Sequence, residues 1–170
     1  MGPAAAWAAV DAVLNARALR PLNVDRPIAV EPLAESDLNL RLADAIVREL
    51  AARGYRVAAG ADRRLIFDTQ IEQATRPGKR LGGEANIGSS GARLQLDWTV
   101  PLQPPADVRP GASYYSLTLS LVGEDGLPIW QAHAAVTAAY RDRYSVCLAA
   151  VMALLDRFGR TVANEHVTFR

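Results

Sequence analysis

Hydrophobic positions along this chain repeat with two periods, one typical of helices and one typical of strands. In residues 36–54 apolar side chains recur every three or four positions. The stripe is formed by Leu38, Leu42, Ile46 and Leu50, flanked by Ala43 and Val47. Ser36 can cap the helix, Asp37 suits the positive end of its dipole, and Gly54 can end it. We therefore predict an amphipathic helix that buries this stripe.

Two further segments show helical spacing. Residues 145–163 carry an apolar stripe that predicts a second long helix, formed by Leu148, Val151, Met152, Leu155, Phe158 and Val162. Residues 4–19 place Trp7, Val10 and Leu14 at helical spacing and predict a short N-terminal helix. Its polar face lacks the Lys/Arg cluster of membrane-binding helices, which favours packing on the core or edge over docking to a membrane or partner.

Strict alternation of apolar and polar side chains predicts strands over residues 65–72, 93–100, 115–121 and 127–140. On the last of these, one face carries Trp130, Ala132, Ala134 and Val136, and the other carries Ile129, Gln131, His133 and Thr137. Residues 123–126 read Gly-Glu-Asp-Gly and predict a hairpin turn. Shorter strands are predicted over residues 28–32, which prolines bound, and residues 55–59.

These elements predict an α+β fold. We expect a two-layer sandwich in which a mixed, mostly antiparallel sheet carries the two main helices on one face, plus the short N-terminal helix. The strand, helix, strand order near the start predicts one parallel pair. Residues 1–22 would form the N-terminal helical segment and residues 23–170 a single α/β domain. The other face of the sheet, being polar, is expected to meet water or a partner.

Composition narrows the function without assigning it. The chain has 170 residues, half of them hydrophobic, which suits one globular domain. A net charge of only +1 gives no long-range attraction for phosphate backbones, so we do not expect nucleic acid as a partner. We find no apolar run long enough to span a bilayer. The single cysteine, Cys147, lies in an apolar helical run, and we predict that it is buried and packs in the core.

Two loop segments interrupt the regular elements: residues 75–92, rich in glycine, and residues 103–111, rich in proline. Arg76, Lys79 and Arg80 precede the glycines, but their spacing matches neither a P-loop nor a dinucleotide fingerprint. We therefore interpret the first segment as a hairpin loop whose basic start can touch an anionic partner or a lipid head group. No cofactor is expected.

Candidate chemistry is limited to one histidine among carboxylates. His133 can share the predicted polar sheet face with Asp68, Glu72 and Asp97, which would place a potential base beside carboxylates. Alternating polar residues are also what a hydrated sheet face requires, and we favour that interpretation. The two histidines of the chain lack metal-ligand spacing, and no nucleophile elbow accompanies the serines, so no catalytic or metal residues are assigned. Trp98 and Trp130 are interpreted as core anchors.

Several short motifs carry a family resemblance. They are the strand at residues 28–32, the helix end Leu-Ala-Ala-Arg-Gly-Tyr at residues 50–55, Ala61-Asp62, and Gly-Leu-Pro-Ile-Trp-Gln at residues 126–131. With these, residues 27–162 resemble a family of small, uncharacterised bacterial envelope lipoproteins. The order of elements is also similar to that of auxiliary lipoproteins of envelope lipid transporters and of the lipopolysaccharide-assembly lipoprotein. The resemblance implies a periplasmic or outer-membrane location and a role through protein or lipid contacts. It supplies no catalytic residues.

Three functions follow as hypotheses. The first is a non-enzymatic envelope binding or assembly module, with Arg76, Lys79, Arg80, Asp68, Asp97 and His133 as candidate partner-binding residues. The second is an accessory lipoprotein subunit of an envelope lipid transporter. The third and weakest is a hydrolase or transferase that uses His133 with Asp68 or Asp97. Because the sequence shows neither a signal segment nor a lipidation cysteine near its start, a cytoplasmic location is the alternative expectation. The oligomeric state stays open.

Overall fold

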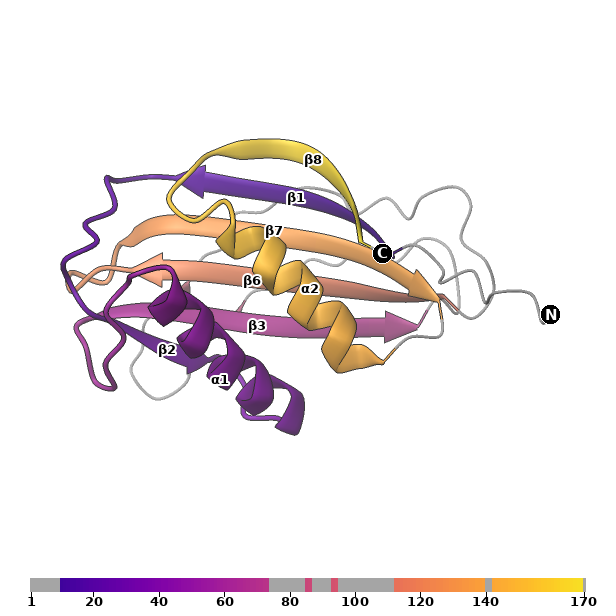
Figure 1. The fold of residues 1–170 in the computed structure, drawn as a ribbon, viewed down its shortest axis with the longest axis horizontal. Coiled ribbons are helices and arrows are strands. Elements are labelled where there is room, and N and C mark those ends of the chain that lie inside the picture. The colour runs from indigo at the N-terminus through magenta and orange to yellow at the C-terminus, as the bar shows by residue number, and fades with distance from the viewer. Residues whose placement is uncertain (1–9, 74–84, 87–92, 95–111, 140–141, 170) are drawn as a thin grey trace.

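The computed structural model describes residues 10–73, 85–86, 93–94, 112–139 and 142–169 (Figure 1). Strands β1 (Val10–Ala18) and β2 (Ile28–Pro32) come first, followed by helix α1 (Asp37–Ala52) and strand β3 (Arg63–Gln73). Two short strands, β4 (Ala85–Asn86) and β5 (Arg93–Leu94), pair with each other in a separate two-stranded sheet. The chain continues with β6 (Ala112–Val122), β7 (Pro128–Ala139), α2 (Arg143–Leu155) and β8 (Val162–Phe169). The expected α+β class is confirmed.

Six strands form one mixed sheet in the order β2-β3-β6-β7-β1-β8. The pair β2 and β3 is parallel, as predicted for a strand, helix, strand unit, and all other neighbours are antiparallel. The parallel partner of β2 is β3, however, and not the strand expected over residues 55–59. That segment contributes a single bridge between Val57 and Ile28. The predicted hairpin is confirmed, because β6 and β7 pair through a turn with Gly126 at a φ of 78°.

The helix expected over residues 4–19 is wrong for Val10–Ala18, which form strand β1 between β7 and β8; residues 4–9 lie outside the described part of the chain. Val10, Ala12, Leu14 and Ala16 are all buried, which is a two-residue period. Val10 and Leu14 also stand four residues apart, so the same apolar residues fit a helical stripe. Pairing along both edges of β1 overrides the high helix propensity of its alanines.

Helix α1 has the predicted cap, the predicted end and the centre of the predicted stripe. The hydroxyl of Ser36 accepts a hydrogen bond from the backbone N–H of Asn39 at 3.1 Å, and Gly54 has a φ of 88° after the last turn. Leu42, Ile46 and Leu50 are fully buried. Figure 1 shows α1 and α2 over the same face of the sheet. Arg41 lies over the ring of Tyr144 at 3.9 Å from the ring centre, which joins the two helices.

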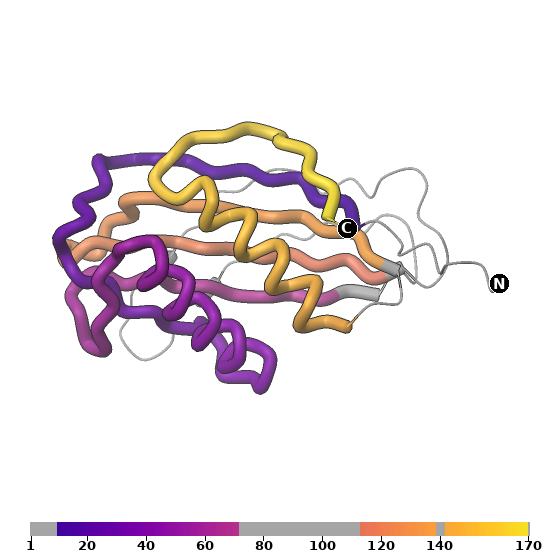
Figure 2. The backbone as a smooth tube through the Cα atoms, viewed as in Figure 1, coloured from indigo at the N-terminus to yellow at the C-terminus, as the bar shows by residue number. Residues whose placement is uncertain are grey.

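Helix α2 is shorter than predicted. It ends at Leu155, and Gly159 then adopts a φ of 77°, which turns the chain into β8. Phe158 and Val162, expected on the helix stripe, therefore lie in the turn and in the strand. β8 curls over β1, and its last residue pairs with Val10 at the start of β1 (Figure 2). The described residues include no helix that is both long and apolar enough to cross a membrane.

One hydrophobic core lies between the helices and the sheet. The predicted inner face of β7 is confirmed, because Trp130, Ala132 and Ala134 have no exposed surface and Val136 has 1%. These small side chains allow α2 to lie close to the strand. The indole Nε1 of Trp130 donates to the carbonyl of Arg160 at 3.0 Å, and its ring packs edge-on against Phe158. Trp130 is thus a core anchor, as predicted, whereas Trp98 lies outside the described residues.

Candidate binding surfaces

The face of the sheet opposite the helices brings only part of the expected polar cluster together. Asp68 pairs with Thr118 on β6, and Thr118 pairs with His133 on β7. Since neighbouring strands lie about 4.8 Å apart, two strand spacings separate Asp68 from His133 by roughly 10 Å at the backbone. Asp68 thus lies two strands away from His133, on the same face of the sheet. Asp97, Arg76, Lys79 and Arg80 lie outside the described residues.

His133 contacts a hydroxyl that the sequence analysis did not single out. The Oγ of Ser116 lies 2.9 Å from the Nε2 of His133. Burial lowers the pKa of His133 to about 4, so the ring is neutral near pH 7. Burial also raises the pKa of Asp68. A neutral imidazole beside a hydroxyl can accept its proton, and Asp68, the carboxylate expected to orient that imidazole, lies two strands away.

The polar sheet face is less exposed than predicted. Ile66 and Ser120 pair with each other on β3 and β6, and they expose only 5% and 2% of their surfaces. The Oγ of Ser120 is buried and has no hydrogen-bond partner. The expectation that this face meets water is therefore wrong around Ile66 and Ser120, and we place no docking surface there.

Metal binding and thiol chemistry find little support in the described part of the chain. No group of three or more His, Cys, Asp or Glu side chains is arranged there to hold a metal ion. Burial raises the pKa of Cys147 to about 12, so its sulfur stays a thiol at neutral pH. Cys147 therefore contributes packing, as its place in the sequence predicts.

The two edges of the six-stranded sheet differ sharply. At the β2 edge the N–H of Ile28 donates to the carbonyl of Arg56 at 2.9 Å, and the N–H of Ala58 donates to the carbonyl of Ile28 at 3.1 Å. Pro27 precedes this five-residue strand and Pro32 ends it. Proline and chain cover are devices that prevent a further strand from adding to an edge. The β2 edge is closed.

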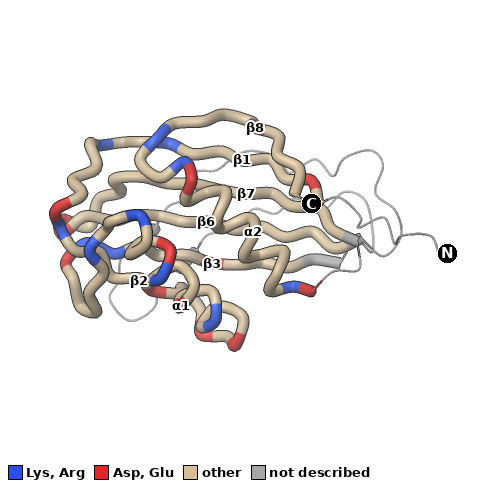
Figure 3. Tube along the Cα trace, in the orientation of Figure 1, with Lys and Arg blue, Asp and Glu red and all other residues tan. Residues whose placement is uncertain are grey.

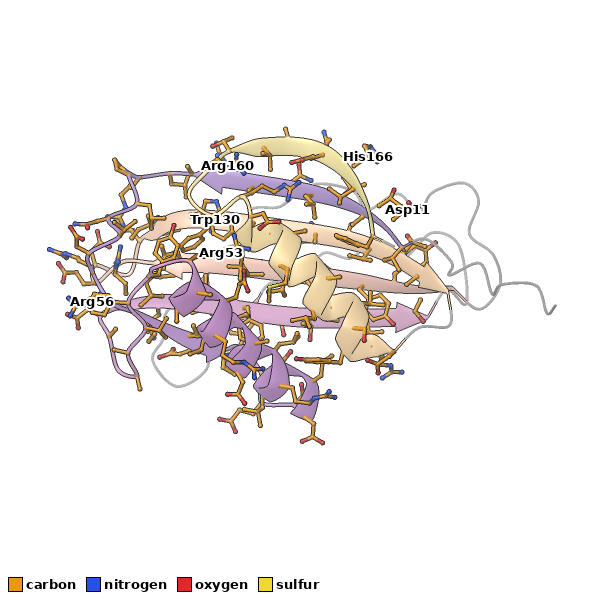
Figure 4. The ribbon with its side chains drawn as sticks, in the orientation of Figure 1. Asp11, Arg53, Arg56, Trp130, Arg160 and His166 are labelled. Atoms are coloured by element: carbon orange, nitrogen blue, oxygen red, sulfur yellow. The ribbon has the colours of Figure 1, made fainter. Side chains whose placement is uncertain are left out.

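Among the described residues, neither proline nor a covering segment protects the β8 edge. β8 has eight residues, without proline, lysine or arginine, and it pairs only with β1 in the sheet. Alternate residues of an edge strand turn their N–H and C=O groups away from the neighbour. Ala163, Asn164, His166 and Thr168 are exposed, and Figure 4 shows His166 on this outer strand. Within the described part of the chain, no strand pairs with the outer backbone of β8.

Side-chain contacts hold β8 firmly to the body of the protein. Both Nε and Nη2 of Arg157 donate to the Glu165 carboxylate, at 2.8 and 2.6 Å. This pair lowers the pKa of Glu165 and offsets its charge. β8 has no other acidic residue and no lysine or arginine (Figure 3). The hydroxyl of Thr168 donates to Asp11 at 3.0 Å, and the N–H of Asn164 donates to the side-chain oxygen of Asn15 at 2.9 Å. β8 is a supported strand with an uncompensated edge.

Sequence reasoning missed both β8 and its supporting pair. The alternation of His166, Val167, Thr168 and Phe169, exposed and half-buried in turn, was present in the sequence. It spans too few residues to stand out beside the strong helical stripe that precedes it. The pairing of Arg157 with Glu165 depends on the turn at Gly159, which the longer predicted helix excluded.

Comparisons with known proteins yield similarities of fold. No protein-family model and no curated protein matches the chain. A PelC dodecamer from Paraburkholderia phytofirmans superposes with a TM-score of 0.51 at 15% identity, over 89% of this chain and 99% of that one. A point variant of that dodecamer gives 0.50 at 14% identity, over 88% and 98%. A PDZ domain protein from Parabacteroides distasonis ATCC 8503 gives 0.53 at 11% identity, over 94% of this chain but 38% of that one.

Proposed function

We propose that this protein is a non-enzymatic binding or assembly module of the bacterial cell envelope that works through protein contacts. The observation that carries the proposal is the open, well-supported edge of β8 beside a closed edge at β2. Proteins that function alone protect long edge strands, because unpaired backbone groups recruit other chains. The regular part of this edge, residues 165–169, has no proline and no chain cover among the described residues and is thus suited to binding a partner.

Two further considerations support this proposal. The PelC structures of similar fold are dodecamers, so a fold of this kind is compatible with assembly from many copies. The resemblance to envelope lipoproteins favours a location in the periplasm or at the outer membrane. In this proposal the two helices and the sheet are the two layers expected from the sequence, and they serve to hold β8 in a fixed position.

The proposal is tested by crosslinking from native membranes with a photoreactive residue at position 168, on the exposed side of β8. The matched control places the same residue at position 48, because Arg48 is exposed on α1, which lies away from β8 (Figure 1). We expect the same identified envelope protein, or a second copy of this chain, to be captured from position 168 and not from position 48. Equal capture from both positions, or capture from neither, would contradict a role for β8.

A further inference from the structure

We infer that residues 165–169 of β8 pair antiparallel with the same residues of a second copy of this chain, around a two-fold axis at Val167. The inference rests on the proposed function and names the partner of the β8 edge. Pairing of this kind would join two six-stranded sheets edge to edge into one continuous sheet.

The regular part of β8 sets the length of the contact. The register between β1 and β8 shifts between Leu14 and Ala16, and Asn164 has a φ of 49° at this irregularity. From Glu165 to Phe169 the pairing with β1 is continuous. Five consecutive residues therefore present a regular outer backbone edge, whereas an added strand would lose its register before Glu165.

The side chains of this segment are complementary to themselves. Residues that lie opposite each other in an antiparallel pair project from the same face of the sheet. A two-fold axis at Val167 places Val167 opposite the partner's Val167, Glu165 opposite the partner's Phe169, and His166 opposite the partner's Thr168. Half-buried residues then meet half-buried residues and exposed residues meet exposed ones. Each protomer thus supplies the apolar and polar alternation that its partner requires.

Charge and rigidity also favour a second copy. Self-association fails when like charges fall opposite each other, but Glu165 is neutralised by Arg157 and would face the partner's phenyl ring. Val167 and Phe169 already pack against the core, and Thr168 is fixed to Asp11. Little conformational freedom remains to be lost on pairing. Because a five-residue edge buries well under about 1,200 Å², we expect a weak, concentration-dependent dimer.

The test compares two double variants that differ in one residue. Both carry Thr168→Lys, where the new ammonium can still pair with Asp11. In the first variant His166→Lys sets lysines opposite each other across the axis, twice per dimer. In the second, His166→Glu sets a carboxylate opposite each lysine. Both positions are exposed, so neither variant disturbs the core, and circular dichroism checks that both fold.

Sedimentation velocity measures the mass of each protein over a concentration series up to about 200 µM, a range suited to a weak contact. We expect the wild type to approach twice the 18.3 kDa of one chain. The lysine-lysine variant should stay monomeric, with dimer affinity reduced at least about tenfold, since opposed like charges destabilise a strand pair. The glutamate-lysine variant should dimerise at least as well as the wild type.

Specific results would overturn the inference. A wild type that stays monomeric throughout the series would contradict it, as would two variants with the same dimer affinity or a larger assembly that neither variant changes. The proposed function fails separately. A monomeric wild type that still crosslinks to an identified envelope protein from position 168 keeps the function and refutes the second copy as partner. A β8-dependent dimer in sedimentation, with nothing captured from position 168 in native membranes, keeps the second copy and refutes the proposed function.

Discussion

Trp130 joins three parts of the fold through one side chain. It projects from β7, donates to the carbonyl of Arg160 in the turn before β8, and packs edge-on against Phe158 at 4.9 Å (Figure 4). Phe158 in turn packs edge-on against Tyr55, which follows α1. Because Trp130 has no exposed surface, its indole N–H has no access to water and needs this carbonyl.

The substitution Trp130→Phe should lower the free energy of unfolding by about 2–4 kcal/mol. Phenylalanine is smaller and lacks the N–H, so a void forms and the carbonyl of Arg160 loses its donor. Urea unfolding measures the change. Leu127→Ala is the control, because Leu127 is 58% exposed, and it should change stability by less than about 0.5 kcal/mol. Equal effects of the two substitutions would show that Trp130 does not anchor the core.

His133 makes stability depend on pH. Its pKa is about 4 in the folded protein because burial disfavours the charged ring, against 6.5 for the ordinary side chain. Between these values the unfolded chain binds the proton and the folded chain does not. Proton binding therefore stabilises the unfolded state relative to the folded state as pH falls from about 6.5 to about 4. Above that window His133 does not lower the free energy of unfolding.

We expect the wild type to lose up to about 3 kcal/mol relative to His133→Gln as pH falls from 6.5 to 4, at about 1.4 kcal/mol per pH unit. The measurement is urea unfolding of both proteins at several pH values in this window. The control His166→Gln alters an exposed histidine and should follow the wild-type profile. Parallel profiles for the wild type and His133→Gln would mean that His133 titrates alike in both states.

At the scale of elements, local signals predicted α1 well. Its cap, its stripe and its terminal glycine all lie within one continuous segment, so they can be recognised without knowing the rest of the fold. What escaped notice was Asn39, which is only 2% exposed within the helix. It donates to the carbonyl of Ala34 at 2.8 Å and accepts from the hydroxyl of Thr69 on β3 at 2.6 Å. Thr69 comes from a distant segment, so no local pattern reveals the contact.

Asn39→Ala should destabilise the protein by about 2–3 kcal/mol, because it leaves the Thr69 hydroxyl and the Ala34 carbonyl without their partners. Ser36→Ala removes only the cap and should cost about 1 kcal/mol. Thermal or urea unfolding of both variants shows which substitution lowers the free energy of unfolding more. The reverse order would mean that α1 is held mainly by its cap and that the bond to β3 adds little.

β1 and β8 show why other elements could not be predicted. Both are decided by pairing between residues more than 140 positions apart, such as Val10 with Phe169. The alanines of β1 fit either a helix or a strand, and the pairing chooses. The candidate site was affected in the same way. His133 was identified, but its contact with Ser116 depends on the register between β6 and β7. The distance between Asp68 and His133 depends on the order of the strands in the sheet.

At the scale of the whole molecule, the described residues protect one edge of the sheet, β2, and leave the other edge, β8, unpaired. Prolines and the backbone of Arg56 and Ala58 close the β2 edge, while β8 presents an ordered edge without such protection. The helices occupy one face and partial burial limits access to the other around Ser120. The β8 edge is therefore the described surface best suited to a protein partner, and our account of the function depends on it.

Hydrogen–deuterium exchange of the β8 backbone amides, measured in dilute and in concentrated protein, tests this claim most directly. The outward amides of residues 165–169 should exchange rapidly in dilute solution and become protected as concentration rises, since pairing with another strand satisfies them. Amides of β2 and α1 should not change with concentration. Slow exchange of the outward amides of β8 already in dilute protein, or new protection confined to α1 or β2, would contradict an open β8 edge. Exchange that is rapid at every concentration would refute the second copy as its partner.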